Sequence, residues 1–230
     1  MVDKGLVTQT GLISHGRGEA FDYLMGERTL DTALKAERAA AAHLLRAKSP
    51  VICVNGNAAA LDPKNLILLA QLIPAKIEVN IFHRTAERME LLISHMEDNG
   101  AKEVLGRDPD ARIPGLSSDR ALCTKEGIYD SDVILVPIED GDRAKALVDM
   151  GKTVISIDIN PLSRTSRTAT ISIADEMTRA LENMITAVKE MKDDPASIEN
   201  VIKGFSNIDN LKETAEEISG SLISQFEGSN

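Results

Sequence analysis

The strongest constraint on the fold lies between residues 132 and 175, where two apolar, β-branched runs flank a short helical pattern. The runs are Val133–Val136 and Val154–Ile157, and the helical pattern between them begins near Asp142 and stops at Gly151. Parallel strands cannot be joined by a tight turn, so a strand, a helix and a second strand in this order form a parallel βαβ unit. The sequence therefore predicts an α/β protein with a mostly parallel, Rossmann-like sheet flanked by helices.

The end of the second run carries residues that suit a nucleotide. Asp158–Asn160 follows the strand directly, and Arg164, Arg167 and Arg179 come after it. Ligands of parallel α/β sheets bind at the carboxyl ends of the strands, where an acid can bind ribose hydroxyls. Guanidinium groups bind phosphates through charge-assisted hydrogen bonds. This stretch therefore predicts a nucleotide site.

Composition narrows the classes of partner. The chain has 230 residues, of which 43% are hydrophobic and 27% charged, as expected of one globular domain with its own core. Its formal net charge is -10, aromatic residues make up 3%, and Trp is absent. A negative field repels nucleic acid and anionic membranes, and no apolar run approaches the roughly 20 residues that span a bilayer. We expect neither a nucleic-acid partner nor a membrane partner.

The cysteines and the N-terminus indicate a reducing compartment. Cys53 and Cys123 lie far apart, and the chain has no CxxC motif and no cluster of His and Cys. Two reduced thiols are therefore expected, without a structural zinc site. The first residues lack the apolar stretch of a signal peptide, which predicts a cytoplasmic protein.

Two arginines near the N-terminus are candidates for binding an anion. Arg17 lies between two glycines, which predicts either an open loop close to a ligand or a plain turn that enters a helix. Arg38 lies on the apolar face of a helix predicted over 30–47, four residues after Leu34 and three before Ala41. An arginine on such a face either extends its charge to the surface or pairs with an anion.

Strand ends, a long loop and the C-terminal helices supply further candidates. A buried strand over 50–54 runs into Asn55-Gly56-Asn57, and a second strand over 76–82 is followed by Arg84. Such ends can bind an anion, although a solvated arginine is an equal alternative at the second. The polar loop over 107–127 contains arginines at 112 and 120 that would serve a ligand site or a subunit contact. From about residue 178 the sequence predicts a helical C-terminal extension, whose seam over 208–222 either docks on its own domain or pairs with a second subunit.

Several long blocks of this sequence resemble one known family. The chain is similar to archaeal phosphopantothenate synthetases, the 4-phosphopantoate–β-alanine ligases, over roughly residues 16–183. The blocks that carry the resemblance are RGEAFDYL at 17–24, VNGNAAAL at 54–61, AKIEVNIFHRT at 75–85, IPGL at 113–116, LVPIEDGDR at 135–143 and IDINPLSRTSR at 157–167.

The resemblance implies an ATP-dependent condensation of 4-phosphopantoate with β-alanine on the archaeal route to coenzyme A. It also implies an acyl-adenylate intermediate, release of AMP and pyrophosphate, a requirement for Mg²⁺, and a homodimer. Two alternatives stay open: a phosphotransferase similar to pantoate kinase, and a binding module that senses a nucleotide. The sequence lacks a Gly-rich loop with a following Lys, which disfavours P-loop chemistry.

The resemblance also assigns residues. Asp158 is expected at the ribose or the adenine edge, and the arginines at the triphosphate. The family favours Asn where this chain has Glu176 and Met177, so contacts there are expected through the backbone or are absent. Catalytic residues and metal ligands stay unassigned, and the weaker candidates for the phosphopantoate are Asn55, Gly56, Asn57 and Arg84. The family's ATP contacts fall on Arg17, Arg38, Asp158, Ile159, Asn160, Arg164, Thr165, Glu176 and Met177.

Overall fold

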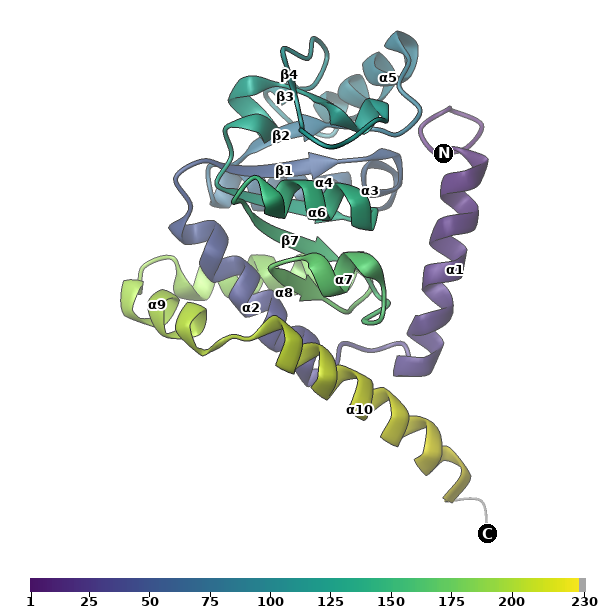
Figure 1. The fold of residues 1–230 in the computed structure, drawn as a ribbon, viewed down its shortest axis with the longest axis vertical. Coiled ribbons are helices and arrows are strands. Elements are labelled where there is room, and N and C mark those ends of the chain that lie inside the picture. The colour runs from purple at the N-terminus through teal and green to yellow at the C-terminus, as the bar shows by residue number, and fades with distance from the viewer. Residues whose placement is uncertain (228–230) are drawn as a thin grey trace.

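A six-stranded parallel sheet forms the centre of the protein, with strand order β3-β2-β1-β6-β7-β8 (Figure 1). The computed structural model describes residues 1–227, with side chains as far as Ile223. From β1 the chain moves outward to β2 and β3, and then returns to place β6 on the other side of β1. The predicted α/β fold is confirmed. The strands are β1 Pro50–Val54, β2 Lys76–Val79, β3 Val104–Leu105, β6 Val133–Pro137, β7 Thr153–Ile157 and β8 Ile171–Ile173, and a small antiparallel pair adds β4 Ala111–Arg112 and β5 Leu122–Cys123.

Helices cover both faces of the sheet, so its central strands are buried throughout. Every residue of β1 and β6 is buried, which explains their continuous apolar runs. The predicted βαβ unit is confirmed as β6, helix α6 (Gly141–Asp149) and β7, which pair in parallel. One face packs against α2 Asp31–Arg46, α4 Pro63–Leu72, α5 Ala86–Asp98, α8 Met177–Met191 and α9 Pro195–Gly204.

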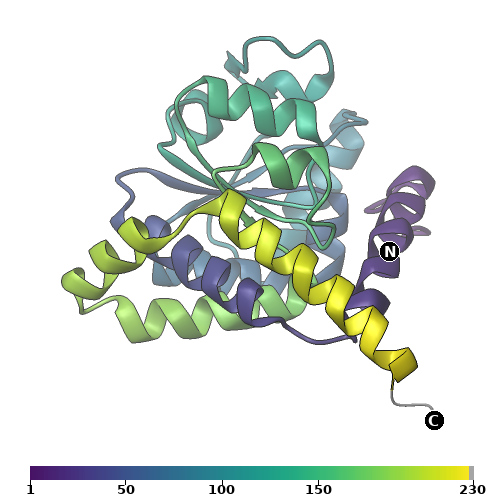
Figure 2. The ribbon, with the colours of Figure 1, turned by 60° about the horizontal axis from the view of Figure 1, so that its bottom comes forward.

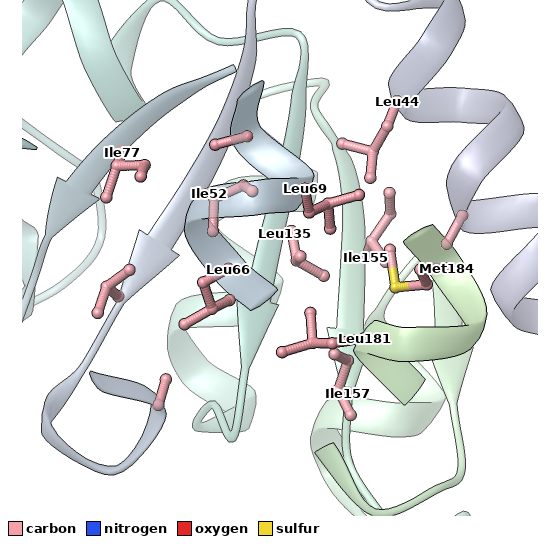
Figure 3. Packing of buried hydrophobic residues seen from close by; sticks show 14 of the residues in the cluster. Leu44, Ile52, Leu66, Leu69, Ile77, Leu135, Ile155, Ile157, Leu181 and Met184 are labelled. Atoms are coloured by element: carbon pink, nitrogen blue, oxygen red, sulfur yellow. The ribbon is translucent and has the colours of Figure 1, made fainter. Parts of the chain in front are cut away.

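The main core lies on this face. Leu44, Leu69, Leu181 and Met184 come from three helices and meet the strand residues Ile52, Leu135 and Ile155 in one layer (Figure 3). Helix α8 is part of this core, so the helical extension predicted from about residue 178 begins only after α8.

The opposite face of the sheet carries a smaller core under α6, the short helix α7 (Arg164–Thr168) and the segment 111–131. Cys53 and Cys123 lie in this core, and both are buried and free, as predicted. The cytoplasmic location stays a prediction. Within residues 1–227, no helix has the length and apolarity needed to cross a membrane.

Helix α10 (Asn207–Glu227) lies beside α2, and its far end projects from the body (Figure 2). Leu211 and Thr214 of α10 are buried, whereas Ile208 is 55% exposed. Part of the predicted seam therefore docks on its own chain, whereas Ile208 does not; whether the seam pairs with a second subunit stays a prediction.

Helix α1 (Gln9–Met25) stands beside the carboxyl ends of the strands, apart from the layered body (Figure 1). The predicted loop around Arg17 is wrong, because Arg17 lies inside this helix. The hydroxyl of Thr8 accepts the Gly11 N–H at the start of α1, and Gly26 ends it with φ +79°. These caps stabilise a helix in which glycines would otherwise be unfavourable.

Candidate functional site

A cavity of about 660 Å³ lies between α1 and the carboxyl ends of the strands. It spans the ends of β1, β6 and β7 and the turn between β8 and α8, including the position where the strand order reverses. Open α/β sheets bind ligands at this position. Of the residues predicted for the site, those that line the cavity are Arg17, Asn55, Gly56, Asn57, Asp158, Ile159, Asn160, Arg164, Thr165, Glu176 and Met177.

Asp158 is held rigidly at the end of β7. Its carboxylate accepts hydrogen bonds from the Ser163 hydroxyl and, at 3.1 Å, from the Asn160 backbone N–H. Burial raises the pKa of Asp158, and the hydrogen bonds and the charge of Arg17 oppose that shift. The carboxylate is thus fixed and partly desolvated, as a group that receives ribose hydroxyls should be.

Arg164 begins α7, and Thr165 ties this helix to the neighbouring strand end. Arg164 makes an exposed ion pair with Asp142, while the Thr165 hydroxyl donates to the Glu139 backbone carbonyl at 2.8 Å. A side chain at position 141 would bring its Cβ within 2.6 Å of the Arg164 Cβ, so Gly141 leaves room for the arginine.

The carboxylate of Glu176 caps the start of α8, so it is already engaged in hydrogen bonds within the chain. The carboxylate accepts the backbone N–H of Thr178 at 2.9 Å and of Arg179 at 3.2 Å. A contact between this position and ATP would therefore use the backbone, and that contact stays a prediction.

Asn55 joins the two strands at the reversal of strand order. Its amide nitrogen donates to the carbonyls of Pro137 at 2.8 Å and Ile138 at 3.1 Å, and its oxygen accepts the Ala58 N–H at 3.0 Å. Asn57 donates to the Gly11 carbonyl at 3.1 Å and so anchors the start of α1. These side chains build the cavity wall, and their predicted contacts with the phosphopantoate stay predictions.

Two predicted residues do not line this cavity. Arg38 donates to Glu190 at 2.5 Å and is 44% exposed, and Arg84 donates to the Gly106 carbonyl at 2.6 Å. The predicted apolar face of α2 is confirmed at Ala41, which is buried, but not at Leu34, which is 42% exposed; small alanines form most of the buried surface under α8, α9 and α10. The position of Arg38 within one chain gives no support to its predicted contact with ATP.

The structure adds cavity residues that the sequence did not single out for this site. Arg120 and Glu139 both line the cavity, and Arg120 and the buried Arg143 each donate to the same oxygen, Oε2 of Glu139. Arg143 also donates to Cys53 Sγ at 3.3 Å. Their only signals in the sequence were the block LVPIEDGDR and the place of Arg120 in a polar loop, and nothing in the spacing of these segments predicts that they meet.

A second charged network anchors the far end of α1. Arg179 donates to Asp22 at 2.6 Å and to Asp175 at 2.7 Å, and these partners raise its pKa. Behind Asp175 lies Glu37 of α2, which is 1% exposed and whose carboxylate oxygens have no hydrogen-bond partner among the described residues. Burial, with the nearby charge of Asp175, raises the pKa of Glu37 to about 8.

The family is shown by comparison with known proteins. A family model described as phosphopantothenate/pantothenate synthetase matches residues 32–221. The chain belongs to this family. The predicted resemblance is therefore confirmed, over a longer stretch of the C-terminal helices than the sequence blocks indicated.

Curated relatives agree with the family. A Methanosarcina mazei protein named 4-phosphopantoate–β-alanine ligase is 55% identical over 218 residues, which is 95% of this chain and 85% of the relative. Proteins with the same name from Thermococcus kodakarensis and Thermococcus onnurineus are 49% and 46% identical, covering 92% and 99% of this chain and 80% and 88% of their own lengths.

The raised pKa of the buried Glu37 should make the stability of the folded protein depend on pH. With a pKa near 8 when folded and 4.5 otherwise, Glu37 binds more protons in the folded state between these values. The free energy of unfolding should therefore fall as pH rises from about 5 to 8, by up to about 1.4 kcal/mol per pH unit. Glu37→Gln should remove this part of the slope, so its gain in Tm over the parent protein should be larger at pH 8 than at pH 5.

Thermal melts across pH 5–8.5 measure this, with the exposed Glu182→Gln on α8 as the matched control. The groups that face Glu37 are Asp175, Arg179 and Asn183. A gain in Tm that is the same at every pH would show that Glu37 is ionised in the folded protein.

Proposed function

We propose that this chain catalyses the ATP-dependent condensation of 4-phosphopantoate with β-alanine to 4'-phosphopantothenate, a step of coenzyme A biosynthesis. The observation that carries the proposal is a cavity at the reversal of strand order, lined by a fixed acid and by arginines from four separate segments. The names of the relatives support the same reaction.

The chemistry is two displacements. A carboxylate oxygen of 4-phosphopantoate attacks the α-phosphorus of ATP, the bond from that phosphorus to the bridging oxygen breaks, and pyrophosphate leaves. The amine of β-alanine then attacks the acyl carbon, the acyl C–O bond breaks, and AMP leaves as the nitrogen loses a proton. Both steps build negative charge on phosphate oxygens, and fixed cations stabilise that charge.

The cavity divides this work among its residues. Asp158 binds the ribose or the adenine edge, and Arg17 and Arg164, which come from α1 and α7, bind the triphosphate. Among the side chains described, residues 1–223, Arg17 forms no ion pair, so its guanidinium is available to a ligand.

Mg²⁺ fits the cavity as an ion carried by ATP. Within residues 1–227, no group of three or more His, Cys, Asp or Glu side chains forms a metal site. Mg²⁺ in nucleotide sites commonly takes most of its ligands from phosphates and water, with one or two carboxylates. Asp140 is exposed at the cavity and would supply one such carboxylate. The ion would neutralise charge on the departing pyrophosphate.

The products identify the reaction. With 4-phosphopantoate, ATP, Mg²⁺ and β-alanine, phosphorus NMR should show AMP and pyrophosphate. Without β-alanine, positional isotope exchange in ATP should report reversible adenylate formation. ADP as the product would indicate a phosphotransferase, and binding of ATP without turnover would indicate a sensing module.

Arg164→Ala should weaken the use of ATP. Losing a charge-assisted contact to phosphate costs roughly 1.5–3 kcal/mol, or about 10- to 150-fold in kcat/KM for ATP. The exposed Arg167→Ala on the same helix α7 is the matched control and should stay close to the parent. Equal kcat/KM values for ATP in both variants would exclude Arg164 from the triphosphate site.

We also propose a homodimer that pairs through α1. Residues at helical spacing form one exposed apolar face on the side away from the cavity: Leu12, Ile13 and Tyr23 are 54%, 73% and 71% exposed. Gly16 and Ala20 lie between them on this face and are also exposed, which leaves room for a second helix to approach closely. Exposed apolar faces of this kind commonly mark protein–protein contacts.

Light scattering at micromolar concentration should give twice the chain mass, and Ile13→Asp should shift the protein toward monomer because a charge would be buried at the contact. Ile208→Asp, at a position of comparable exposure on α10, is the matched comparison. A dimer that dissociates only in the Ile208 variant would place the contact on α10 instead.

A further inference from the structure

The half of the cavity near β1 and β2 contains a cation that the ATP site does not use. Arg120 lines this half, comes from the polar segment between β4 and β6, and is 6% exposed. Arg88 lines the same half, but its guanidinium donates hydrogen bonds to the backbone carbonyls of Gly5, Leu6 and His83. Arg88 therefore ties the N-terminal segment down, whereas Arg120 faces the cavity.

The backbone of Arg120 is fixed from below by β2. Asn80, which is fully buried, donates to the carbonyls of Arg120 at 3.3 Å and Leu122 at 2.8 Å. Asn80 directly follows β2, and Glu78 within β2 accepts the N–H groups of Thr124 at 2.8 Å and Ile128 at 2.7 Å. Buried polar groups that hold one loop in place are typical of a preorganised binding residue.

Arg120 keeps a hydrogen-bond donor that this charged cluster does not use. Arg120 and Arg143 share one carboxylate, Glu139, whose side chain is 1% exposed. The three groups together carry one excess positive charge, and Nε of Arg120 is buried without a hydrogen-bond partner among the described residues. The nearby Glu78 accepts hydrogen bonds from Thr124 and Ile128 and acts on Arg143 through its charge, but it makes no hydrogen bond to either guanidinium among the described residues. A buried excess charge is costly unless an anion completes it.

Glu139 does not need Arg120 for its own neutralisation. Arg143 is fully buried and pairs with Glu139, which lies four residues earlier in the chain. Burial lowers the pKa of Arg143, but Cys53 and Glu139 raise it by more, so Arg143 stays charged. Arg143 alone therefore balances the carboxylate. Arg120 is the surplus cation, and it is the member of the cluster that lines the cavity.

We propose that Arg120 binds the phosphoryl group of the acid substrate and so distinguishes 4-phosphopantoate from pantoate. The inference rests on the proposed function, in which two anionic substrates must lie in one cavity with the acid's carboxylate toward ATP. Asp158, Arg164 and Glu176 occupy the half near β7 and β8, which leaves the β1–β2 half for the acid substrate. A fixed guanidinium with an unused donor suits a phosphomonoester there.

The test compares Arg120→Met with the parent protein in three measurements. KM for 4-phosphopantoate should rise roughly 10- to 100-fold, as expected for loss of one charge-assisted contact. KM for ATP should stay within about twofold, and the inhibition constant of pantoate, which lacks the phosphoryl group, should not change. The matched control is Arg112→Met, an exposed arginine of the same segment that donates to the Leu116 carbonyl and does not line the cavity.

Each outcome decides between assignments. Equal weakening of pantoate and 4-phosphopantoate would place Arg120 at the carboxylate, and a rise confined to KM for ATP would place it at the triphosphate; either result overturns the proposal. If the Met variant melts early, Arg120→Lys keeps a cation beside Glu139 and should still weaken 4-phosphopantoate alone.

The proposed function can fail separately. If the parent protein forms no AMP from 4-phosphopantoate, ATP and β-alanine, the ligase proposal is wrong. Calorimetric binding of 4-phosphopantoate against pantoate then tests Arg120 directly. Selective loss of phosphoester binding in Arg120→Met would support the assignment, and unchanged binding would overturn it.

Discussion

The hydrogen bonds of the Asn55 side chain hold together the two strands on which the site depends. In a parallel sheet covered on both faces, the chain leaves each strand toward one layer of helices, and the ends diverge only where the strand order reverses. Here that position lies between β1 and β6, and Asn55 spans it by donating to the carbonyls of Pro137, the last residue of β6, and Ile138. A cavity can open at this point because the strands that flank it are fixed to each other.

Backbone strain at Ile138, directly after β6, helps to orient the carboxylate of Glu139 in the charged cluster. Ile138 has φ +52°, a conformation that is unfavourable for a β-branched residue and costs about 1–3 kcal/mol. Its N–H still bonds to the Ile157 carbonyl at 2.9 Å, so the turn is held from β7. The next residue, Glu139, thereby points its carboxylate inward between Arg120 and Arg143. Backbone strain and buried charge thus occur together at the floor of the cavity.

The sequence predicted the sheet well because the pattern of buried strands is local. β6, α6 and β7 were readable from two apolar runs and a helical spacing, and Asp158 followed from its place at a strand end. Long-range contacts were not readable. The glycines near Arg17 favour a loop by propensity, yet capping by Thr8 and Gly26 and packing beside the strand ends make a helix.

The same limit explains Arg38 and Arg120. Arg38 was placed by the spacing of large residues, but α2 packs through its alanines because three helices crowd around it, and small side chains carry little signal in a hydrophobic pattern. Arg120 reaches the cavity only because Asn80 and Glu78, on a strand some forty residues earlier, fold the loop back over the sheet. Both polar side chains are fully buried, which the alternation of polar and apolar residues over 76–82 does not indicate.

The two kinds of arginine in the cavity suit two kinds of binding. Arg164 and Asp142 are both well exposed, so their ion pair is worth little and can be exchanged for a phosphate with small loss. The side chains of Arg120 and Glu139 are nearly buried, and breaking their ion pair would leave an unpaired charge shielded from water. An anion at Arg120 must therefore add to the existing pair instead of replacing it. In the proposed reaction, the exposed Arg164 side of the cavity would rearrange as ATP enters and AMP leaves, while the buried Arg120 side would keep one geometry, which is the condition for aligning a carboxylate with the α-phosphorus.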